Sequence, residues 1–403
     1  MSADLANLST NMVKYVASGN NYYVANNVQA GAKKMQEYQV IYTPTTSVSS
    51  IFASQGGLLQ FTCPPSSNGL DEVSNVFLEL NITNNHASTW SPLVAPLMIE
   101  HYEQDTNNSP IDQVVGEAIL LDQILHATRD ETEVLAIEEN FTVGTYAVTN
   151  TVLTGASATY RINLSYSDMI VRSKLNPSLV KQQINWSFYF NSLANASLAA
   201  NLATATVNVT SANLYMVGVR YDPLVKAAIY KRFATGDPIV HRFYRHNWLN
   251  YAQVFTNGTQ TTLALTEFNQ SFAYFGFLIR AGSANENRMV FKSISNASLR
   301  DSQGFPVGGL VNYSGTMITR DLMPYSFPSL SARANTLNLY ALSYASDPDF
   351  AVQQGASEGY LKMNSAFSLQ LTPSQTLGVN FAAFGASIAN LVLNNGTISV
   401  MAV

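Results

Sequence analysis

The stretch Val76–Thr89, VFLELNITNNHAST, alternates apolar and polar side chains and then enters a run of turn-forming residues. The apolar side of the alternation consists of Val76, Leu78, Leu80 and Ile82. A period of two is typical of a β-strand with one buried face, and the Asn-Asn-His-Ala-Ser cluster predicts the turn that ends it. The opposite side carries mostly uncharged polar groups, and this feature recurs along the chain.

Charged residues are scarce throughout the sequence. They make up 12% of the 403 residues, about half of the roughly 25% usual in soluble domains, whereas hydrophobic residues make up 47%. The length suits two domains of roughly 150–200 residues each. Because a free monomer normally stays soluble through scattered charges, we interpret the Asn, Ser, Thr and Gln in their place as a surface that copies of the chain cover. A polar β-protein with an uncharged face is the alternative.

Charge and cysteine content exclude several classes of protein. The net charge is −5 and there is no polybasic tail, which predicts no direct sequence-specific nucleic acid binding, because phosphate contacts require clustered Lys and Arg. Cys63 is the single cysteine, so an intrachain disulfide and a cysteine-based zinc site are excluded. It shares the apolar side of a strand with Leu59 and Phe61, where we expect a buried thiol. The start, MSADLANLST, shows no signal-peptide pattern.

The chain divides into four predicted segments. Residues 1–37 form an N-terminal helical arm, with Leu5, Leu8, Met12 and Val16 at helical spacing. Residues 38–221 and 238–403 show β patterning, and residues 222–237 link them. Strands are expected in the first region near 39–46, 57–63, 75–84, 97–104, 145–153, 158–167, 183–192 and 203–219. In the second region they are expected near 259–267, 271–281, 288–294, 312–319, 336–345, 360–372, 377–385 and 390–402.

One helix is expected within the first β region. Ser109, Pro110 and Asp112 supply a capping hydroxyl, a proline at the first helical position and an acid in the first turn. The residues that would then line one face of this helix are Val114, Ala118, Leu121 and Leu125.

The two β regions share a texture that suggests duplication. No charged residue occurs from Gln182 to Val219 or from Met363 to Val403, and each run closes its region. About eight strands per region, with one longer excursion between the middle strands, favour a jelly roll over a seven-stranded immunoglobulin sandwich. The predicted fold is therefore all-β: two consecutive eight-stranded jelly rolls, with an N-terminal helical arm and a helix inserted in the first roll.

Catalytic and metal-binding patterns do not emerge from the sequence. His241 and His246 flank Arg242–Arg245, but their spacing fits neither one helix face nor one strand face, so an interdomain or intersubunit contact is the simpler interpretation. His86 and His101 lack the regular spacing of a metal site. A charge-rich segment holds four acids that we interpret as a solvated face: Glu131, Glu133, Glu138 and Glu139. We predict no enzymatic activity, no cofactor and no metal.

Two motifs resemble those of a known family. Residues 80–89, LNITNNHAST, follow the arm and an extended segment, in an order that resembles the start of major capsid proteins of tectivirus-type tailless phages. Residues 339–349, LYALSYASDPD, leading into 359–365, GYLKMNS, resemble a pattern in the second roll of large-DNA-virus capsid proteins, with Tyr344 and Asp347 replacing its Phe and Asn. Together these features resemble the double jelly-roll major capsid proteins of tailless icosahedral double-stranded DNA viruses.

This resemblance implies a structural protein of the virion, made in the host cytoplasm. Three chains would form a pseudo-hexagonal homotrimeric capsomer that tiles an icosahedral shell, with neighbouring capsomers, penton proteins and minor capsid proteins as partners. The arm would lie at the base of the shell, against an internal lipid membrane or a neighbouring capsomer. The arm residues singled out for this role are Leu5, Leu8, Met12, Val16, Lys33 and Lys34.

Two other readings of the residues stay open at this point. A virion spike, receptor-binding or carbohydrate-binding β-sandwich would explain the many tyrosines and Asn-rich loops, but it requires neither an arm nor a duplicated roll. An enzyme on a jelly-roll scaffold would require two converging carboxylates on buried strand faces. The strands that can be placed carry almost none.

Overall fold

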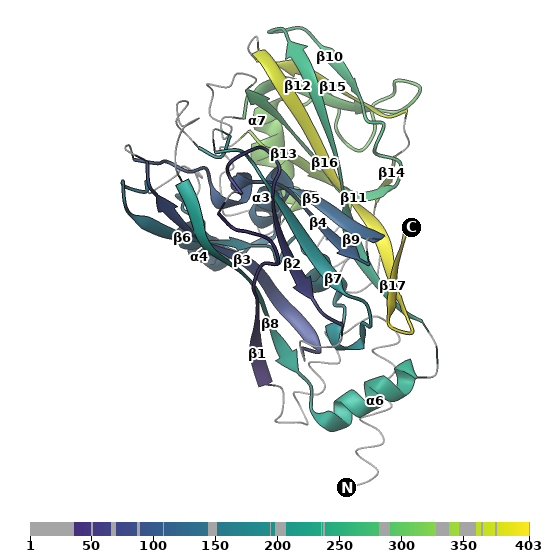
Figure 1. The fold of residues 1–403 in the computed structure, drawn as a ribbon. Coiled ribbons are helices and arrows are strands. Elements are labelled where there is room, and N and C mark those ends of the chain that lie inside the picture. Colours follow the sequence, from purple (N-terminus) through teal and green to yellow (C-terminus); the bar gives the residue numbers. More distant parts are fainter. Residues whose placement is uncertain are drawn as a thin grey trace.

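Two β-sheet units follow one another along the chain and are joined by a helix (Figure 1). The architecture comes from a computed structural model, which describes residues 36–49, 51–65, 70–86, 89–107, 109–143, 151–193, 195–197, 207–234, 236, 238–281, 291–327, 338–345, 360–363, 366–374 and 377–402. The predicted arm residues lie outside the described residues: Leu5, Leu8, Met12, Val16, Lys33 and Lys34.

The described residues of the first unit form eight strands in two sheets. They are β1 (Gln36–Tyr42), β2 (Gly57–Cys63), β3 (Glu72–Asn84), β4 (Ile99–Thr106), β5 (Ser109–Val115), β6 (Ser157–Asn163), β7 (Ile184–Phe190) and β8 (Val207–Arg220). One sheet has the order β1-β8-β3-β6 and the other β2-β7-β4-β5, and all pairs are antiparallel. Because the chain changes sheet at every connection except that from β4 to β5, this unit is a jelly roll.

The second unit repeats this order. Its strands are β9 (Ile239–Phe255), β10 (Thr261–Ala264), β11 (Ser271–Ala281), β12 (Ile294–Arg300), β13 (Tyr340–Ser343), β14 (Leu361–Lys362), β15 (Ser368–Pro373), β16 (Leu377–Asn394) and β17 (Thr397–Ala402). The run β9-β16-β11-β13 matches β1-β8-β3-β6, and β10-β15-β12 matches β2-β7-β4. At the place of β5, Tyr313 forms an isolated bridge to Ala297 of β12. The second jelly roll thus has one strand reduced to a bridge.

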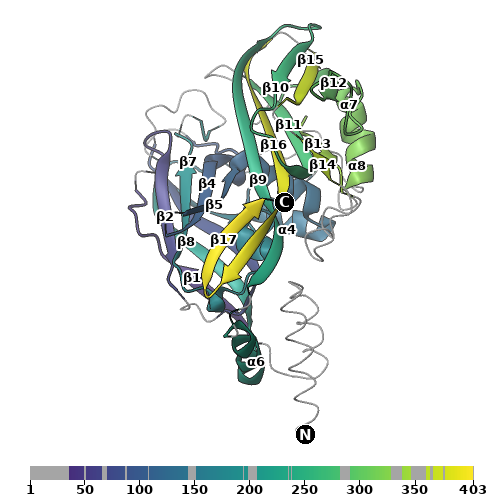
Figure 2. The ribbon, with the colours of Figure 1, turned by 90° about the vertical axis from the view of Figure 1, so that its right-hand side faces the viewer.

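Helices occupy the connections between strands. In the first roll they are α3 (Gly116–His126), α4 (Arg129–Glu138), α5 (Met169–Ser173) and the 3₁₀ turns Ala95–Met98 and Pro177–Leu179. The helix α6 (Pro223–Phe233) joins the rolls. In the second roll α7 (Gly315–Met317), the π-helical turn Ile318–Leu322 and α8 (Met323–Ser326) form one continuous helical run. Figure 2 shows β9 and β16 side by side along the second roll, with the β16–β17 hairpin reaching down beside the first.

Alternation along the strands sets the two faces of each sheet, as predicted. Val76, Leu78, Leu80 and Ile82 of β3 are all 0% exposed. On β7, Trp186 and Phe188 are equally buried, and Phe188 packs edge-on against Phe61 of β2 at a centroid distance of 5.9 Å. Cys63 is buried, as expected, and its sulfur lies 3.2 Å from the Tyr42 hydroxyl.

The predicted start of the inserted helix is wrong. Ser109–Val115 is strand β5, paired with β4, and the helix begins only at Gly116. Pro110 is compatible with this strand because β5 lies at the edge of its sheet, where a missing N–H breaks no ladder. Ser109 pairs with Thr106 across a tight turn in which Asn107 has a φ of 47°. Tertiary pairing therefore overrides the local helix signal.

Three strand predictions in the second roll also need correction. Strand β9 was missed because its buried side changes along the strand: Ile239, His241 and Phe243 are buried on one side, and Tyr244 and His246 on the other. The segment 312–319 was expected as a strand, but after Tyr313 it enters the α7 helix. The strand expected at 288–294 lies at Ile294–Arg300 instead. Most of the strand expected at 145–153 lies outside the described residues.

The two charge-free runs occupy equivalent places. The run from Gln182 to Val219 contains β7 and most of β8, and the run from Met363 contains β15 and β16. These pairs hold the same positions in the sheet orders of the two rolls. The duplication expected from the similar composition of the two charge-free runs is therefore present in the strand order of the two rolls.

Candidate functional site at the junction of the two rolls

A buried ionic cluster joins the two rolls. His246 on β9 of the second roll lies between two acids of the first roll, Asp112 on β5 and Asp122 on α3. Its Nδ1 is 2.9 Å from Asp112 Oδ2, and its Nε2 is 2.9 Å from Asp122 Oδ2. The three side chains are at most 2% exposed. With Arg172 and Tyr274, described next, these residues form what we call the junction cluster.

Arg172 and Tyr274 complete the cluster, one from each roll. Arg172, on α5 of the first roll, places Nη2 3.7 Å from Asp122 Oδ2, and its guanidinium stacks over the Tyr244 ring at 5.4 Å. Tyr274, on β11 of the second roll, donates its hydroxyl hydrogen to Asp122 Oδ1. Arg172 Nη1 also approaches His246 Nε2 to 3.2 Å, a contact between two donors that the shared carboxylate of Asp122 stabilises.

Charge balance explains the protonation states in the cluster. Burial alone lowers the pKa of His246, but Asp112 and Asp122 together outweigh it and raise this pKa to about 9. Burial alone raises the pKa of Asp122, but Arg172 and His246 lower it to about 2. At neutral pH the carboxylate of Asp122 therefore faces the guanidinium of Arg172 and the imidazolium of His246.

A third buried acid, Asp168, positions Arg172. Asp168 caps α5 by accepting the backbone N–H of Ile170 at 2.9 Å. Its other carboxylate oxygen accepts hydrogen bonds from Trp186 Nε1 and Gln104 Nε2, each at 2.9 Å. Burial raises the pKa of Asp168 to about 6. These bonds anchor the short helix to strands β4 and β7, so that the guanidinium of Arg172 points at the second roll.

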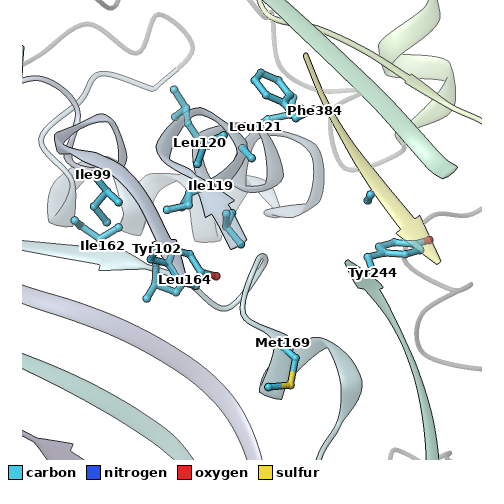
Figure 3. Close-up of a cluster of buried hydrophobic side chains, with 14 of the residues drawn as sticks. Ile99, Tyr102, Ile119, Leu120, Leu121, Ile162, Leu164, Met169, Tyr244 and Phe384 are labelled. Atoms are coloured by element: carbon cyan, nitrogen blue, oxygen red, sulfur yellow. The ribbon is translucent and has the colours of Figure 1, made fainter. Parts of the chain in front are cut away.

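Apolar packing continues across the junction beside the cluster. Leu121 of α3 points toward Phe384 of β16 (Figure 3). A Cβ added at Gly276 of β11 would lie 2.7 Å from a methyl carbon of Leu121 and 3.1 Å from Phe384 Cδ2. At the rim, Glu117 of α3 pairs with Arg280 of β11 at 2.8 Å. Helix α3 thus packs closely on the outer face of β9, β16 and β11, and the absence of a side chain at Gly276 allows this close approach.

The lower end of the first roll is held by two further contacts. Lys226 of α6 lies 3.0 Å from Asp71, which is buried at the start of β3. In the β16–β17 hairpin, Gly396 accepts the backbone N–H of Lys181 at 2.9 Å, and the Ile398 N–H donates to Gln182 Oε1 at 2.6 Å. The β16–β17 hairpin of the second roll therefore contacts the first roll in addition to the junction cluster.

A cavity of about 340 Å³ opens beside the cluster. Its lining mixes acids, bases and amides and includes Glu103, Gln113, Arg245, Trp248 and Glu267. Trp248 Nε1 donates to Gln113 Oε1 across the opening at 3.2 Å. Among the described residues no group of three or more His, Cys, Asp or Glu side chains has the arrangement of a metal site. The described helices also include none long and apolar enough to cross a membrane.

The histidines and glutamates singled out from the sequence have different environments. His246 makes the interdomain contact that its setting suggested, whereas His241 is buried apart from the acids, and burial lowers its pKa to about 4. Glu131 completes a capping box with Thr128 at the start of α4. Glu139 contradicts the expected solvated face: it is 0% exposed, accepts hydrogen bonds from Gln123 and the Asn163 N–H, and burial raises its pKa to about 8.

Sequence reasoning missed the two acids that bind His246. Asp122 lies within Ile119–Leu125, a run that is otherwise apolar apart from Gln123. A single acid in such a run is the signal that could have identified it, because a buried carboxylate requires a partner. Asp112 was assigned to the first turn of a helix, which hid its position on a strand.

The fold resembles those of solved capsid structures. No family model matches the sequence, and no curated protein matches it. The PBCV-1 virus capsid model matches with a TM-score of 0.69 and 11% identity, over 91% of this chain and 96% of that chain. The Faustovirus major capsid protein matches with a TM-score of 0.58 and 9% identity, over 96% and 98%. The major capsid protein of STIV matches with a TM-score of 0.53 and 11% identity, over 88% and 96%. This chain has the double jelly-roll fold of these viral major capsid proteins.

Proposed function

We propose that the chain is a structural capsid subunit, and that three copies form a pseudo-hexagonal capsomer that tiles an icosahedral virion shell. The observation that carries this proposal is the extent of the structural likeness. It covers 96% of this chain and 98% of the Faustovirus major capsid protein, including both rolls and their connection. A spike or an enzyme built on a single jelly roll would match such proteins over only about half the chain.

The junction cluster supports the same role. A buried ionic cluster, an apolar contact through Gly276 and a terminal hairpin hold the two rolls in one orientation. The chain is therefore a single block that presents two similar rolls side by side. Three such blocks supply the six similar units that a pseudo-hexagonal capsomer needs.

The polar strand faces suit contacts between proteins. On the outer face of β3, Asn81 donates to Ser211 Oγ at 2.7 Å and accepts from the Thr159 hydroxyl at 2.5 Å. Such neutral groups can meet another surface directly or through water without burying an unpaired charge. This explains why a chain with few charges carries Asn, Ser and Thr on its strands.

The remaining assignments follow from this role. We propose units at 38–221 and 238–403, a linker at 222–237, and an arm at 1–37 that contacts neighbouring capsomers or an internal lipid membrane through Leu5, Leu8, Met12, Val16, Lys33 and Lys34. Neighbouring capsomers, penton proteins and minor capsid proteins are the proposed partners. Synthesis in the host cytoplasm, residence in the shell and a structural rather than enzymatic role complete the proposal.

Light scattering on the purified chain across a concentration series tests the proposal first. We expect a mass near three times 43.9 kDa that persists on dilution, and electron micrographs of particles with a hexagonal outline. An obligate trimer should persist because its interfaces are large and comparatively apolar. A mass of one chain at every concentration would contradict the capsomer.

A further inference from the structure

The two rolls carry the same helical excursion at the same place. In the first roll α3 begins at Gly116, directly after β5. In the second, the helical run begins at Gly315, two residues after the bridge that replaces β5. A Cβ at Gly116 would lie 2.2 Å from the carbonyl oxygen of Ile99, and one at Gly315 would lie 2.9 Å from that of Ile294. Because Ile99 and Ile294 begin the equivalent strands β4 and β12, the two glycines are equivalent positions.

One face of α3 makes the contact between the rolls. Counted from Gly116, the contacting residues lie one, five, six and ten positions along the helix. Glu117 pairs with Arg280, and Leu121 packs beside Gly276. Asp122 binds His246, and the His126 ring lies 5.9 Å from the Tyr274 ring. This face of the helix covers the outer face of β9, β16 and β11.

The same positions of the second helical run are exposed. Counted from Gly315, they are Thr316, Arg320, Asp321 and Tyr325, and all four are exposed. Tyr325 is 90% exposed, more than any other large hydrophobic side chain among the described residues. A helix face that is buried in one roll is therefore open to solvent in the other.

The surface equivalent to the one that α3 covers carries exposed side chains, among them Thr159 of β6 and Thr210 of β8. It is the outer face of β1, β8, β3 and β6, which lies on the side of the first roll away from the second (Figure 1). Phe77 stacks on Tyr215 there at 4.8 Å and forms an aromatic floor. Arg161 lies over the Phe77 ring at 5.4 Å and pairs with Glu79 at 2.7 Å. This face offers an aromatic surface and the partly exposed guanidinium of Arg161, which also lies 3.6 Å from Glu138 of α4, whereas Glu79 beneath it is buried.

We propose that the exposed face of α7–α8 in one chain docks on the β1-β8-β3-β6 face of the next chain. Within one chain, α3 of the first roll packs on β9, β16 and β11 of the second. The proposed contact between chains has the same geometry. It places Tyr325 on the aromatic floor and Asp321 beside Arg161. Because the two faces differ, the contact is head-to-tail, and such contacts form a closed ring when the rotation permits. This inference rests on the proposed trimeric capsomer and names the surfaces that build it.

Two single variants test the two faces separately. Tyr325→Asp places a charge on the helix face, and Thr159→Arg places one on the sheet face, where Thr159 is exposed on β6 opposite Asn81. We expect each variant to keep the circular dichroism and thermal unfolding of the natural chain but to show the mass of one chain by light scattering. Phe305→Asp is the matched control, because Phe305 is 63% exposed and lies outside both faces. It should remain a trimer.

Mixing the two variants tests the head-to-tail geometry. The Tyr325→Asp chain keeps an intact sheet face and the Thr159→Arg chain an intact helix face, so one junction can form between them. An equimolar mixture should therefore show a mass of two chains, whereas each variant alone should not. A folded Tyr325→Asp chain that is still trimeric, or a mixture that stays at one chain, would overturn this junction and leave the capsomer in place. A natural chain that is monomeric would overturn both.

Discussion

His246 of the second roll and Asp112 of the first are joined twice. The ring Nδ1 lies 2.9 Å from Asp112 Oδ2, and the His246 backbone N–H donates to Asp112 Oδ1 at 2.9 Å. The same imidazole binds Asp122 through Nε2. A single side chain therefore fixes a strand of one roll against a strand and a helix of the other, and it does so with a charge that is fully buried.

Replacing His246 should loosen the junction strongly. His246→Leu leaves two buried carboxylates facing Arg172 alone, and breaking a buried ion pair in this way costs about 3–5 kcal/mol. We expect the free energy of unfolding, measured by urea titration, to fall by that amount. His86→Gln serves as the control, because His86 is only partly buried and lies outside the cluster. It should change the value by no more than about 0.5 kcal/mol. Equal effects of the two substitutions would contradict the role of the cluster.

The contribution of His246 to the free energy of unfolding should be lost at alkaline pH. Its pKa is raised to about 9, so the stabilisation is complete below pH 6.5, the ordinary value, and is lost as the pH rises through 9. The shift corresponds to roughly 3 kcal/mol, since one pKa unit is worth about 1.4 kcal/mol. We expect the difference in unfolding free energy between the natural chain and His246→Leu to shrink between pH 6.5 and pH 9.5.

The unfolding free energies of the natural chain and of His246→Leu are compared as a difference because another group, Glu139, titrates in the same pH range. Glu139 has a pKa raised to about 8, so its ionisation also destabilises the fold as the pH rises. Both chains contain Glu139, and its effect cancels in the difference between them. A difference that does not change with pH would show that His246 is not charged in the folded protein.

The two faces of a strand were predictable from the sequence where apolar residues line one side of the strand and polar residues line the other. Val76 to Ile82 and Trp186 to Phe190 alternate in this way in the sequence, and the structure buries their apolar sides; on β7 it also buries Ser187 of the opposite side. Strand β9 does not, because the first roll covers one face of it and the sheet core the other. The buried side of this strand changes from that of His241 and Phe243 to that of Tyr244 and His246, so no single period of two runs through it.

The junction cluster could not be assembled from the sequence for a different reason. His246 and Asp112 are 134 positions apart, and His246 and Asp122 are 124 apart, with no local spacing that relates them. Only the docking of one roll on the other brings them together. The interdomain role of the His241–His246 segment was predictable from its place between the rolls, but its partners were not.

Gly276 and Leu121 should show strong coupling. Gly276→Val would force a side chain against the Leu121 methyl group, and overpacking of this kind costs about 1–3 kcal/mol. Leu121→Ala alone removes a fully buried side chain and should cost about 2–5 kcal/mol. The double variant should lose less than the sum of the two, because each change relieves the other. Additive unfolding free energies would contradict the contact.

A charge on the core-facing side of β7 should destabilise the first roll. Phe188 is 0% exposed between the two sheets, so Phe188→Asp buries a carboxylate without a partner and should cost about 3 kcal/mol or more. Leu58→Asp on the neighbouring strand is the control, because Leu58 is 38% exposed and pairs opposite Tyr189 rather than Phe188. It should cost less than about 1 kcal/mol. A comparable loss in both variants would argue against the assigned faces.

Removing the N-terminal segment should separate folding from assembly. Strand β1 begins at Gln36, inside the predicted arm, and pairs there with Arg220, so the deletion should end at residue 35 to leave the sheet intact. The truncated chain should keep its unfolding free energy and its trimeric mass but form no shells in electron micrographs. Lys33→Glu and Lys34→Glu in the full chain then distinguish the two proposed roles of the arm. Each lysine near anionic lipid contributes on the order of 1 kcal/mol, so loss of binding to anionic vesicles with shells preserved would indicate a membrane contact. Loss of shells with vesicle binding unchanged would indicate a lock between capsomers, and an unfolded truncated chain would contradict the assembly role.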